Sequence, residues 1–258
     1  MTHSAGLTAV MLFAATLLLS GPFVQAETGK DTRAREIVQR MDELYRADSS
    51  ETTMEMEITT PHWQRTLKIQ AWSRGTDKTF LRILEPRKER GMATLRVGNE
   101  MWNYLPKTNK VMKIPPSMMM GSWMGSDFTN DDLVKEYTFL EDYRFEMTTV
   151  DDPEPGILYV KSTPLPDRPI VWGHVVTAVQ EKGYLPTWQK FYDEKGKLMR
   201  RIDFSAVRTF GKRTIPSVMT LVPLNKRGHR TVVRYLDADF NIPVHRDTFS
   251  LRNLRTRI

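Results

Sequence analysis

The chain has 258 residues, a formal net charge of +7 and no cysteine. The lack of cysteine excludes disulfide bonds, thiol catalysis and thiolate metal sites. The length suits one domain with an ample core, and the basic balance favours anionic head groups or acidic protein faces as partners.

The first 26 residues carry no Lys, Arg, Asp or Glu, and an apolar run occupies residues 7–19. A break at Gly21-Pro22 and a small-x-small pattern at residues 24–26 are typical of a secretory signal. A transmembrane anchor is the alternative, but the run is shorter than the roughly 18 residues that a span needs. We therefore predict a signal peptide at 1–26 and a single domain at 27–258, located in the periplasm. No cysteine follows the run for acylation, and nucleic acid is not an expected partner.

The mature chain opens with a predicted helix at residues 31–45, in which Ile37, Met41 and Leu44 recur at three- and four-residue steps. From Glu51 the apolar period changes to two. This alternation predicts strands that bury one face and leave the other to solvent, as in an antiparallel sheet. The first three strands are expected at residues 54–58, 67–71 and 80–84.

The central stretch, residues 86–136, changes character several times. Strands are expected at 93–97, 101–105 and 111–114, with a turn at Gly98-Asn99. Pro115-Pro116 then prevents further sheet pairing, because neither ring nitrogen has a hydrogen to donate. A loop follows that is rich in methionine and glycine, too short and glycine-rich for a stable helix. A short helix is predicted near residues 130–136, capped by Asp127 or Thr129.

Strand-like segments resume after the helix and continue almost to the C-terminus. They lie at residues 137–150, 156–162, 171–181, 186–192, 198–207, 215–222 and 230–236. Around ten short strands with no helical alternation predict a barrel or a strongly curved sheet. Such a sheet buries its apolar face by closing on itself or by accepting a helical lid, and an unfilled cavity beneath a lid is typical of a lipid pocket.

The run GMATLRVGNEMWNYLPKTNKVMKIPPSMMMGSWMGSDFTNDDL, residues 91–133, resembles the signature of the LolA-like outer-membrane lipoprotein-sorting proteins, a family of bacterial periplasmic proteins. The resemblance extends from about Ala34 to the C-terminus. It implies an incomplete antiparallel β-barrel whose concave apolar face is covered by helices and loops and holds acyl chains. We therefore expect a mainly β fold, an incomplete barrel or strongly curved sheet of about ten strands, covered by the N-terminal helix and the central helix and loop.

The sequence offers no support for catalysis. The histidines of the mature chain are far apart, no carboxylates stand at metal-ligand spacing, and no nucleophile elbow or phosphate-binding glycine loop is present. The two Asp doublets, at 131–132 and 151–152, sit where a helix cap or a turn explains them. We expect no enzyme activity, no catalytic residue, no metal and no cofactor.

The methionine cluster has two interpretations. Its thioether side chains could simply fill gaps in the barrel floor, or they could line a cavity that adapts to acyl chains of different length. Trp102 and Tyr104 share one strand face, and either that face or its opposite could line the cavity. The residues expected to form the lipid cavity and its lid are Met54, Met56, Ile58, Leu67, Ile69, Trp102, Tyr104, Met112, Ile114, Met118, Met119, Met120, Trp123, Met124 and Phe128.

The predicted function is a periplasmic, non-catalytic carrier that binds acyl chains and transfers lipoproteins toward the outer membrane. Two alternatives stay open: a carrier of another lipid supplied by an inner-membrane transporter, and a lipid-sensing regulator of envelope stress. The expected partners are lipoprotein acyl chains or another lipid, an inner-membrane transporter and an outer-membrane acceptor. We further expect transient membrane contact and a monomer. The basic pairs, such as Lys226-Arg227, are either solvated charge or docking sites for membrane or acidic partners.

Overall fold

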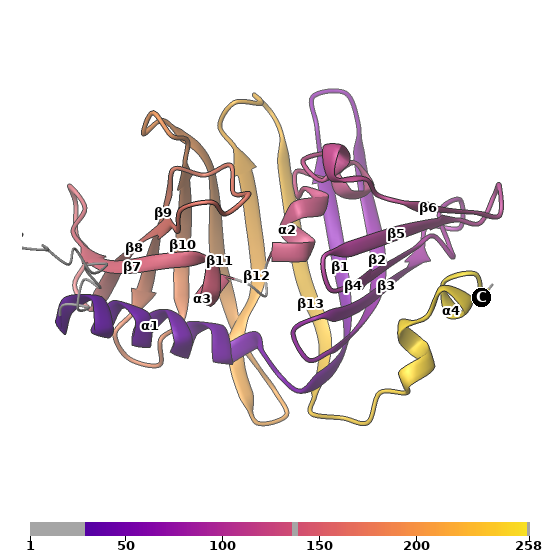
Figure 1. The fold of residues 1–258 in the computed structure, drawn as a ribbon, viewed down its shortest axis with the longest axis horizontal. Coiled ribbons are helices and arrows are strands. Elements are labelled where there is room, and N and C mark those ends of the chain that lie inside the picture. The colour runs from indigo at the N-terminus through magenta and orange to yellow at the C-terminus, as the bar shows by residue number, and fades with distance from the viewer. Residues whose placement is uncertain (1–28, 136–138, 257–258) are drawn as a thin grey trace, which may run out of the picture.

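A computed structural model describes residues 29–135 and 139–256. The predicted signal peptide, residues 1–26, lies outside the described residues. The described chain forms one antiparallel sheet with a few short helices around it (Figure 1).

The sheet contains thirteen strands. They are β1 (Ser49–Thr59), β2 (Gln64–Arg74), β3 (Lys78–Glu85), β4 (Ala93–Val97), β5 (Glu100–Leu105), β6 (Lys110–Lys113), β7 (Tyr143–Thr148), β8 (Ile157–Pro164), β9 (His174–Gln180), β10 (Pro186–Tyr192), β11 (Leu198–Phe210), β12 (Arg213–Pro223) and β13 (Arg230–Phe240). The thirteen strands follow, in order, the thirteen strand-like segments expected from the sequence, so the round figure of about ten was too low; the shortest strand is β6, with four residues. The turn at Gly98, with φ of +58°, divides β4 from β5 as predicted.

The strand order is β6-β5-β4-β3-β2-β1-β13-β12-β11-β10-β9-β8-β7, so the first and last strands of the chain pair at the centre of the sheet. Met56 of β1 lies opposite Val233 of β13, and Leu67 of β2 lies on the other side of Met56. The two edge strands, β6 and β7, do not pair with each other. The sheet is therefore an incomplete barrel, which confirms the predicted fold class.

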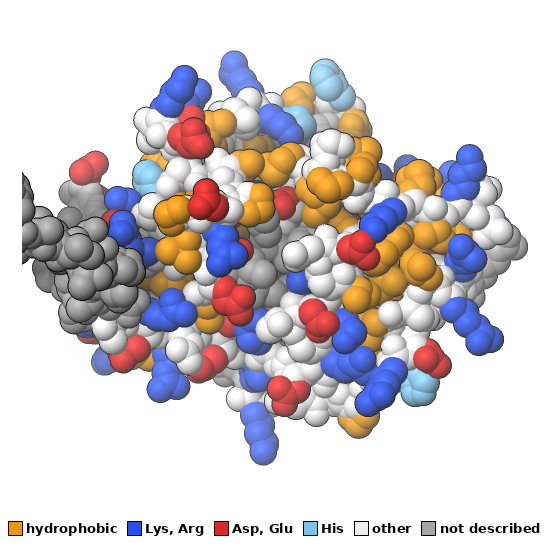
Figure 2. Space-filling view, in the orientation of Figure 1, with side chains coloured by type: hydrophobic (Ala, Val, Ile, Leu, Met, Phe, Trp, Pro, Cys, Tyr) orange, Lys and Arg blue, Asp and Glu red, His pale blue; other side chains and the backbone are white. Residues whose placement is uncertain are grey.

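Two groups of segments cover the concave face. Helix α1 (Gly29–Tyr45) packs on the half formed by β7 to β12, where Ala34, Ile37 and Val38 are almost completely buried. The other half is covered by the 3₁₀ turns η1 (Pro116–Met118) and η2 (Trp123–Gly125) and by helix α2 (Asn130–Lys135). Figure 2 shows charged side chains of both signs over α1 and more apolar side chains over the second group.

The outer face of the sheet has a small core of its own. The 3₁₀ turn η3 (Arg246–Phe249) and helix α4 (Leu251–Leu254) place Phe249 and Leu254 against Phe80 and Tyr104. The C-terminal segment thus covers strands β3 to β5 on the side away from α2.

One predicted strand, residues 137–150, is partly wrong. Residues 137–138 lie outside the described chain, helix α3 occupies Phe139–Asp142, and β7 begins only at Tyr143. The ring of Phe139 lies 4.5 Å from that of Tyr143 and packs against the core under α1. Tertiary packing of this aromatic residue overrides its local preference for strand.

Candidate functional site

A cavity of about 370 Å³ lies between the concave face of the sheet and the segments that cover it. We call it the central cavity. Its apolar lining comes from both halves of the sheet and from the cover, and includes Met54, Met56, Ile69, Leu81, Val233, Phe191, Ile202, Phe204, Met219, Met41, Tyr45, Trp123, Phe128, Leu133 and Phe139. Cavities of this size and character hold apolar ligands in many proteins.

Strand alternation directs these side chains inward. Met54 and Met56 of β1 point to the same face because side chains alternate along a strand. The cross-strand partner of Met54 on β2 is Ile69, and Val233 of β13 lies beside Met56, so neighbouring strands supply a continuous apolar wall. Phe128, next to α2, packs against the cores of both halves and joins them over the cavity.

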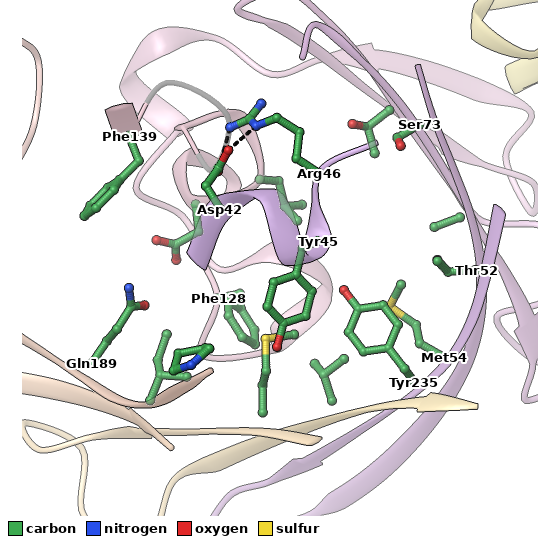
Figure 3. Close-up of a pocket in the computed structure, with 18 of the residues that line it drawn as sticks. Asp42, Tyr45, Arg46, Thr52, Met54, Ser73, Phe128, Phe139, Gln189 and Tyr235 are labelled. Carbon is green, nitrogen blue, oxygen red and sulfur yellow. Dashed lines mark hydrogen bonds and ion pairs between the residues drawn. The ribbon is translucent and has the colours of Figure 1, made fainter. Parts of the chain in front are cut away.

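The end of α1 forms one polar border of the cavity (Figure 3). Arg46 donates to Asp42 one turn earlier, with Nη2 2.7 Å from Oδ1, and both side chains are largely buried. The Tyr45 side chain lines the cavity beside this pair, and its hydroxyl donates to the carbonyl oxygen of Pro216 at 3.0 Å. Tyr235 and Met54 face the same space in Figure 3. This border combines the rings of Tyr45 and Tyr235 with the Asp42–Arg46 ion pair, whose two charges offset each other.

A second ion pair joins the cover to the sheet. Arg200 of β11 donates to both carboxylate oxygens of Asp132 in α2, at 2.7 and 2.8 Å. The guanidinium also lies over the rings of Phe191 and Trp172, 4.1 and 4.6 Å from their centroids. Only 8% of the Arg200 side chain is exposed, so the pair is shielded from solvent. A bidentate pair of this kind fixes both the distance and the orientation of α2.

The same pair controls local ionisation. Burial alone would raise the pKa of the Asp132 carboxyl, but the charge of Arg200 and the hydrogen bonds from Arg200 and Thr129 lower it overall. Thr129 and Asp132 exchange hydrogen bonds in a capping box, which identifies Thr129 as the cap of α2. Burial raises the pKa of the neighbouring Tyr143 hydroxyl, which therefore stays neutral.

Four further polar contacts hold the segment before α2. Asp127 accepts from the Thr231 hydroxyl at 2.9 Å, and it lies 3.2 Å from Nδ1 of His229. Arg65 donates to the carbonyl of Met124, whose φ is +50°. The indole of Trp123 is buried and donates to Thr94 Oγ1 at 3.0 Å. These polar contacts to strands β2, β4 and β13 add to the apolar packing of Trp123, Met124 and Phe128 in fixing the segment.

The structure places the residues predicted for the lipid site in several environments. The ones that line the central cavity are Met54, Met56, Ile69, Trp123 and Phe128. Core positions close to it are occupied by Ile58, Leu67, Ile114, Met119 and Met124. On the outer face, under the C-terminal segment, lie Trp102 and Tyr104. The exposed members are Met112, Met118 and Met120.

Much of the cavity wall is formed by residues that the sequence did not single out. Arg200, Ile202 and Phe204 on β11 line it, as does Phe191 on β10. Their two-residue spacing was visible in the sequence, but the pattern alone did not show which strands face the lid. Arg200 in particular resembles an ordinary solvated charge beside Arg201, because only the fold brings Asp132 to it.

Among residues 29–135 and 139–256, no group of three or more His, Cys, Asp or Glu side chains is placed to hold a metal ion. The helices in those ranges are all too short or too polar to cross a membrane.

A family model and several solved structures match this chain. A family model described as "-like: Uncharacterized protein" matches residues 75–256, and no curated protein matches the chain. A putative outer membrane lipoprotein-sorting protein domain from Vibrio parahaemolyticus is 24% identical, with a TM-score of 0.75 over 88% of this chain and 100% of that one. A DUF1329 family protein from Desulfovibrio piger is 19% identical, with a TM-score of 0.78 and the same coverage of both chains.

A LolA superfamily protein from Nitrosomonas europaea is 21% identical, with a TM-score of 0.69 over 85% of this chain and 98% of that one. At these identities the solved structures establish the fold. The family model covers well over half of the chain. The chain therefore belongs to the family that this model describes, and it shares the fold of the LolA superfamily protein.

Proposed function

We propose that this protein is a periplasmic, non-catalytic carrier that binds acyl chains in the central cavity and transfers lipoproteins toward the outer membrane. The observation that carries the proposal is the apolar cavity of about 370 Å³ between an open sheet and a separate cover. Support also comes from the lipoprotein-sorting description of the Vibrio parahaemolyticus neighbour, whose fold this chain shares.

The energetics explain why a carrier would need such a cavity. Burial of each CH₂ group is worth roughly 0.8 kcal/mol, so a sixteen-carbon chain carries on the order of 12 kcal/mol of transfer free energy. Spontaneous escape from a bilayer into water is then very slow. The cavity has to offer a comparable apolar surface and still release the chain. Four methionines in its wall, Met41, Met54, Met56 and Met219, can adjust to chains of different shape.

The cover provides a route for entry and release. Helix α2 is attached to the sheet through the ion pair of Asp132 with Arg200 and through the packing of Leu133, and we infer that the ion pair is exchanged for other contacts when cargo enters. The predicted leader at residues 1–26 supports export to the periplasm. An inner-membrane transporter that loads the carrier and an outer-membrane acceptor that unloads it complete the proposed route.

A tryptophan introduced into the cavity wall tests the proposal, because it fills the cavity with a largely apolar ring. Met54 lines the cavity, whereas Met112 is 44% exposed on β6, so Met54→Trp and Met112→Trp form a matched pair. We expect Met54→Trp to weaken binding of a fluorescent fatty acid and of a diacylated lipopeptide at least tenfold, because the indole occupies the space of the chain. Met112→Trp should bind like the wild type.

Denaturant unfolding has to accompany these measurements, so that only folded variants are compared. Native mass spectrometry of protein purified from periplasm should also detect a bound lipid. Equal affinity of the two variants, or no acyl binding by the wild type, would refute the proposed function.

A further inference from the structure

Four connecting segments meet at one end of the sheet. They are residues 60–63 between β1 and β2, 86–92 between β3 and β4, 115–126 around η1 and η2, and 224–229 between β12 and β13. We call this end the hairpin rim. In Figure 1 the β1–β2 and β12–β13 hairpins rise together above the rest of the sheet.

Side-chain contacts hold the rim together as one surface. A Cβ at Gly228 would lie 3.1 Å from the ring of Pro61, so the two tall hairpins touch. Arg65 links the other segments, because its guanidinium lies 5.3 Å from the Trp63 ring, donates to Glu89 at 3.0 Å and donates to the Met124 carbonyl.

Large apolar side chains are exposed along this rim. Trp63 is 44% exposed, Leu224 52%, Met118 56% and Met120 45%. They stand on three different segments, so no single sequence motif produces them. A group of exposed apolar side chains on turns that contact one another marks an interaction surface more often than isolated exposed residues do.

The charge of the rim has one dominant sign. Its four segments contain Arg87, Lys88, Arg90, Lys226 and Arg227, against a single carboxylate, Glu89. Glu89 is only 13% exposed and is bonded to Arg65, so little negative charge reaches the surface. Figure 2 shows Lys and Arg side chains beside apolar ones along the upper edge of the molecule.

Two turns at the opposite end of the sheet differ from the rim. Residues 75–77 between β2 and β3 and 211–212 between β11 and β12 contain one Asp and one Lys. None of the exposed large apolar side chains of the described residues lies in these two turns. The combination of apolar tips and unbalanced positive charge that marks the hairpin rim is therefore absent from these two turns.

We propose that the hairpin rim docks the protein on an anionic bilayer, with Trp63 and Leu224 entering the headgroup region and the Lys and Arg side chains contacting lipid phosphates. Tryptophan prefers the membrane interface, and basic side chains beside it are attracted by anionic lipids. The inference rests on the proposed carrier function and specifies which surface meets the membrane. The covering segment 115–126 belongs to the rim, so docking brings the lid of the cavity to the lipid.

The first experiment measures co-sedimentation of the mature protein with vesicles. One set contains equal parts of phosphatidylglycerol and phosphatidylcholine, and the other contains phosphatidylcholine alone. We expect binding to the anionic set only, decreasing as salt is added. The double variant Lys226→Gln, Arg227→Gln should lose roughly 30-fold in affinity, since each cation near the surface contributes about fivefold.

The control variant removes the same charge elsewhere. Arg252→Gln, Arg255→Gln changes two exposed cations of the C-terminal segment, away from the rim, and should keep most of the vesicle affinity. An equal loss in both double variants would overturn the proposal, because it would show a general effect of net charge. Binding to neither set of vesicles, or equal binding to both, would also overturn it.

A second experiment locates the contact. Brominated phospholipids quench tryptophans that enter the bilayer, so the vesicle-bound protein should lose fluorescence, and Trp63→Phe should abolish most of that loss. Unchanged quenching in Trp63→Phe would place another surface against the membrane. Fatty-acid binding should stay normal in all rim variants. If the wild type binds vesicles through the rim but no acyl chain, the carrier function fails while the docking surface stands.

Discussion

The two covers of the concave face are attached to the sheet by different means. Helix α1 is attached mainly by apolar burial, with Ala34 and Val38 at 0% exposure and Ile37 at 3%. The segment from η1 to α2 also packs apolar side chains such as Trp123 against the core, but it adds directed polar contacts from Arg65, Thr231 and Arg200. Apolar burial is lost gradually as surfaces separate, whereas a few hydrogen bonds can be exchanged for others in one step.

This difference indicates that the two covers have different roles. We expect α1 to behave as part of the fold and the second cover as its movable part. Met118 and Met120 support this view, since they remain exposed although they stand beside a core that could have buried them.

The strongest effect should come from Asp132→Asn. This change leaves the Arg200 guanidinium buried without a counter-charge, and loss of one member of a buried pair costs roughly 3 to 5 kcal/mol. Replacing both residues, as Asp132→Leu with Arg200→Met, should cost much less, because no buried charge remains. Urea unfolding of both variants measures the difference. A single variant as stable as the wild type would show that the pair does not hold the cover.

Acid titration provides an independent check of the same contact. The pKa of Asp132 is lower in the folded protein than in the unfolded chain, so the unfolded state binds its proton first as pH falls. The contribution of the ion pair to the free energy of unfolding is complete above the unfolded-state pKa of about 3.9. It is lost as pH drops through the folded-state pKa. The Asp132→Asn variant should lack this part of the acid dependence.

A smaller effect is expected from Val38→Ser in α1. Val38 is fully buried against the strands, and a hydroxyl there lacks the packing of the two methyl groups, which costs about 2 to 3 kcal/mol. Fatty-acid affinity of the folded protein should change little, since Val38 does not line the cavity. Glu36→Ser, on the exposed side of the same helix, is the control. A large loss of lipid affinity without loss of stability would assign α1 to the movable part.

Much of the architecture could be predicted from the sequence because it depends on local patterns. The two-residue alternation around Met54, Met56 and Ile58 places β1, and Gly98 at positive φ places the turn after β4. The lipid site depends on which strands curve toward the cover, and alternation gives two faces without choosing between them. Trp102 and Tyr104 show the ambiguity, since the fold turns them to the outer core under Phe249.

Long-range polar contacts were the least predictable feature. Arg200 and Asp132 are 68 residues apart, and neither has a local pattern that distinguishes it from a surface charge. Phe139 and Tyr143 show the same limit within a short segment, because packing under α1 turns a strand-like stretch into α3. The apolar side chains available for a cavity could be recognised in the sequence. Which of them line the cavity depends on the register of the whole sheet.

The smallest effect on stability is expected from Met118→Ser, Met120→Ser. Both side chains are about half exposed, so their replacement should change the free energy of unfolding by less than about 0.5 kcal/mol. Met119→Ser is the matched control between them, and it should cost about 1 to 3 kcal/mol because Met119 packs against the core cluster beside the cavity. If the exposed pair belongs to the docking rim, its loss should weaken binding to anionic vesicles severalfold and leave fatty-acid binding unchanged. Loss of stability equal to that of Met119→Ser would show instead that the whole methionine segment is core, and the contrast between the two covers would disappear.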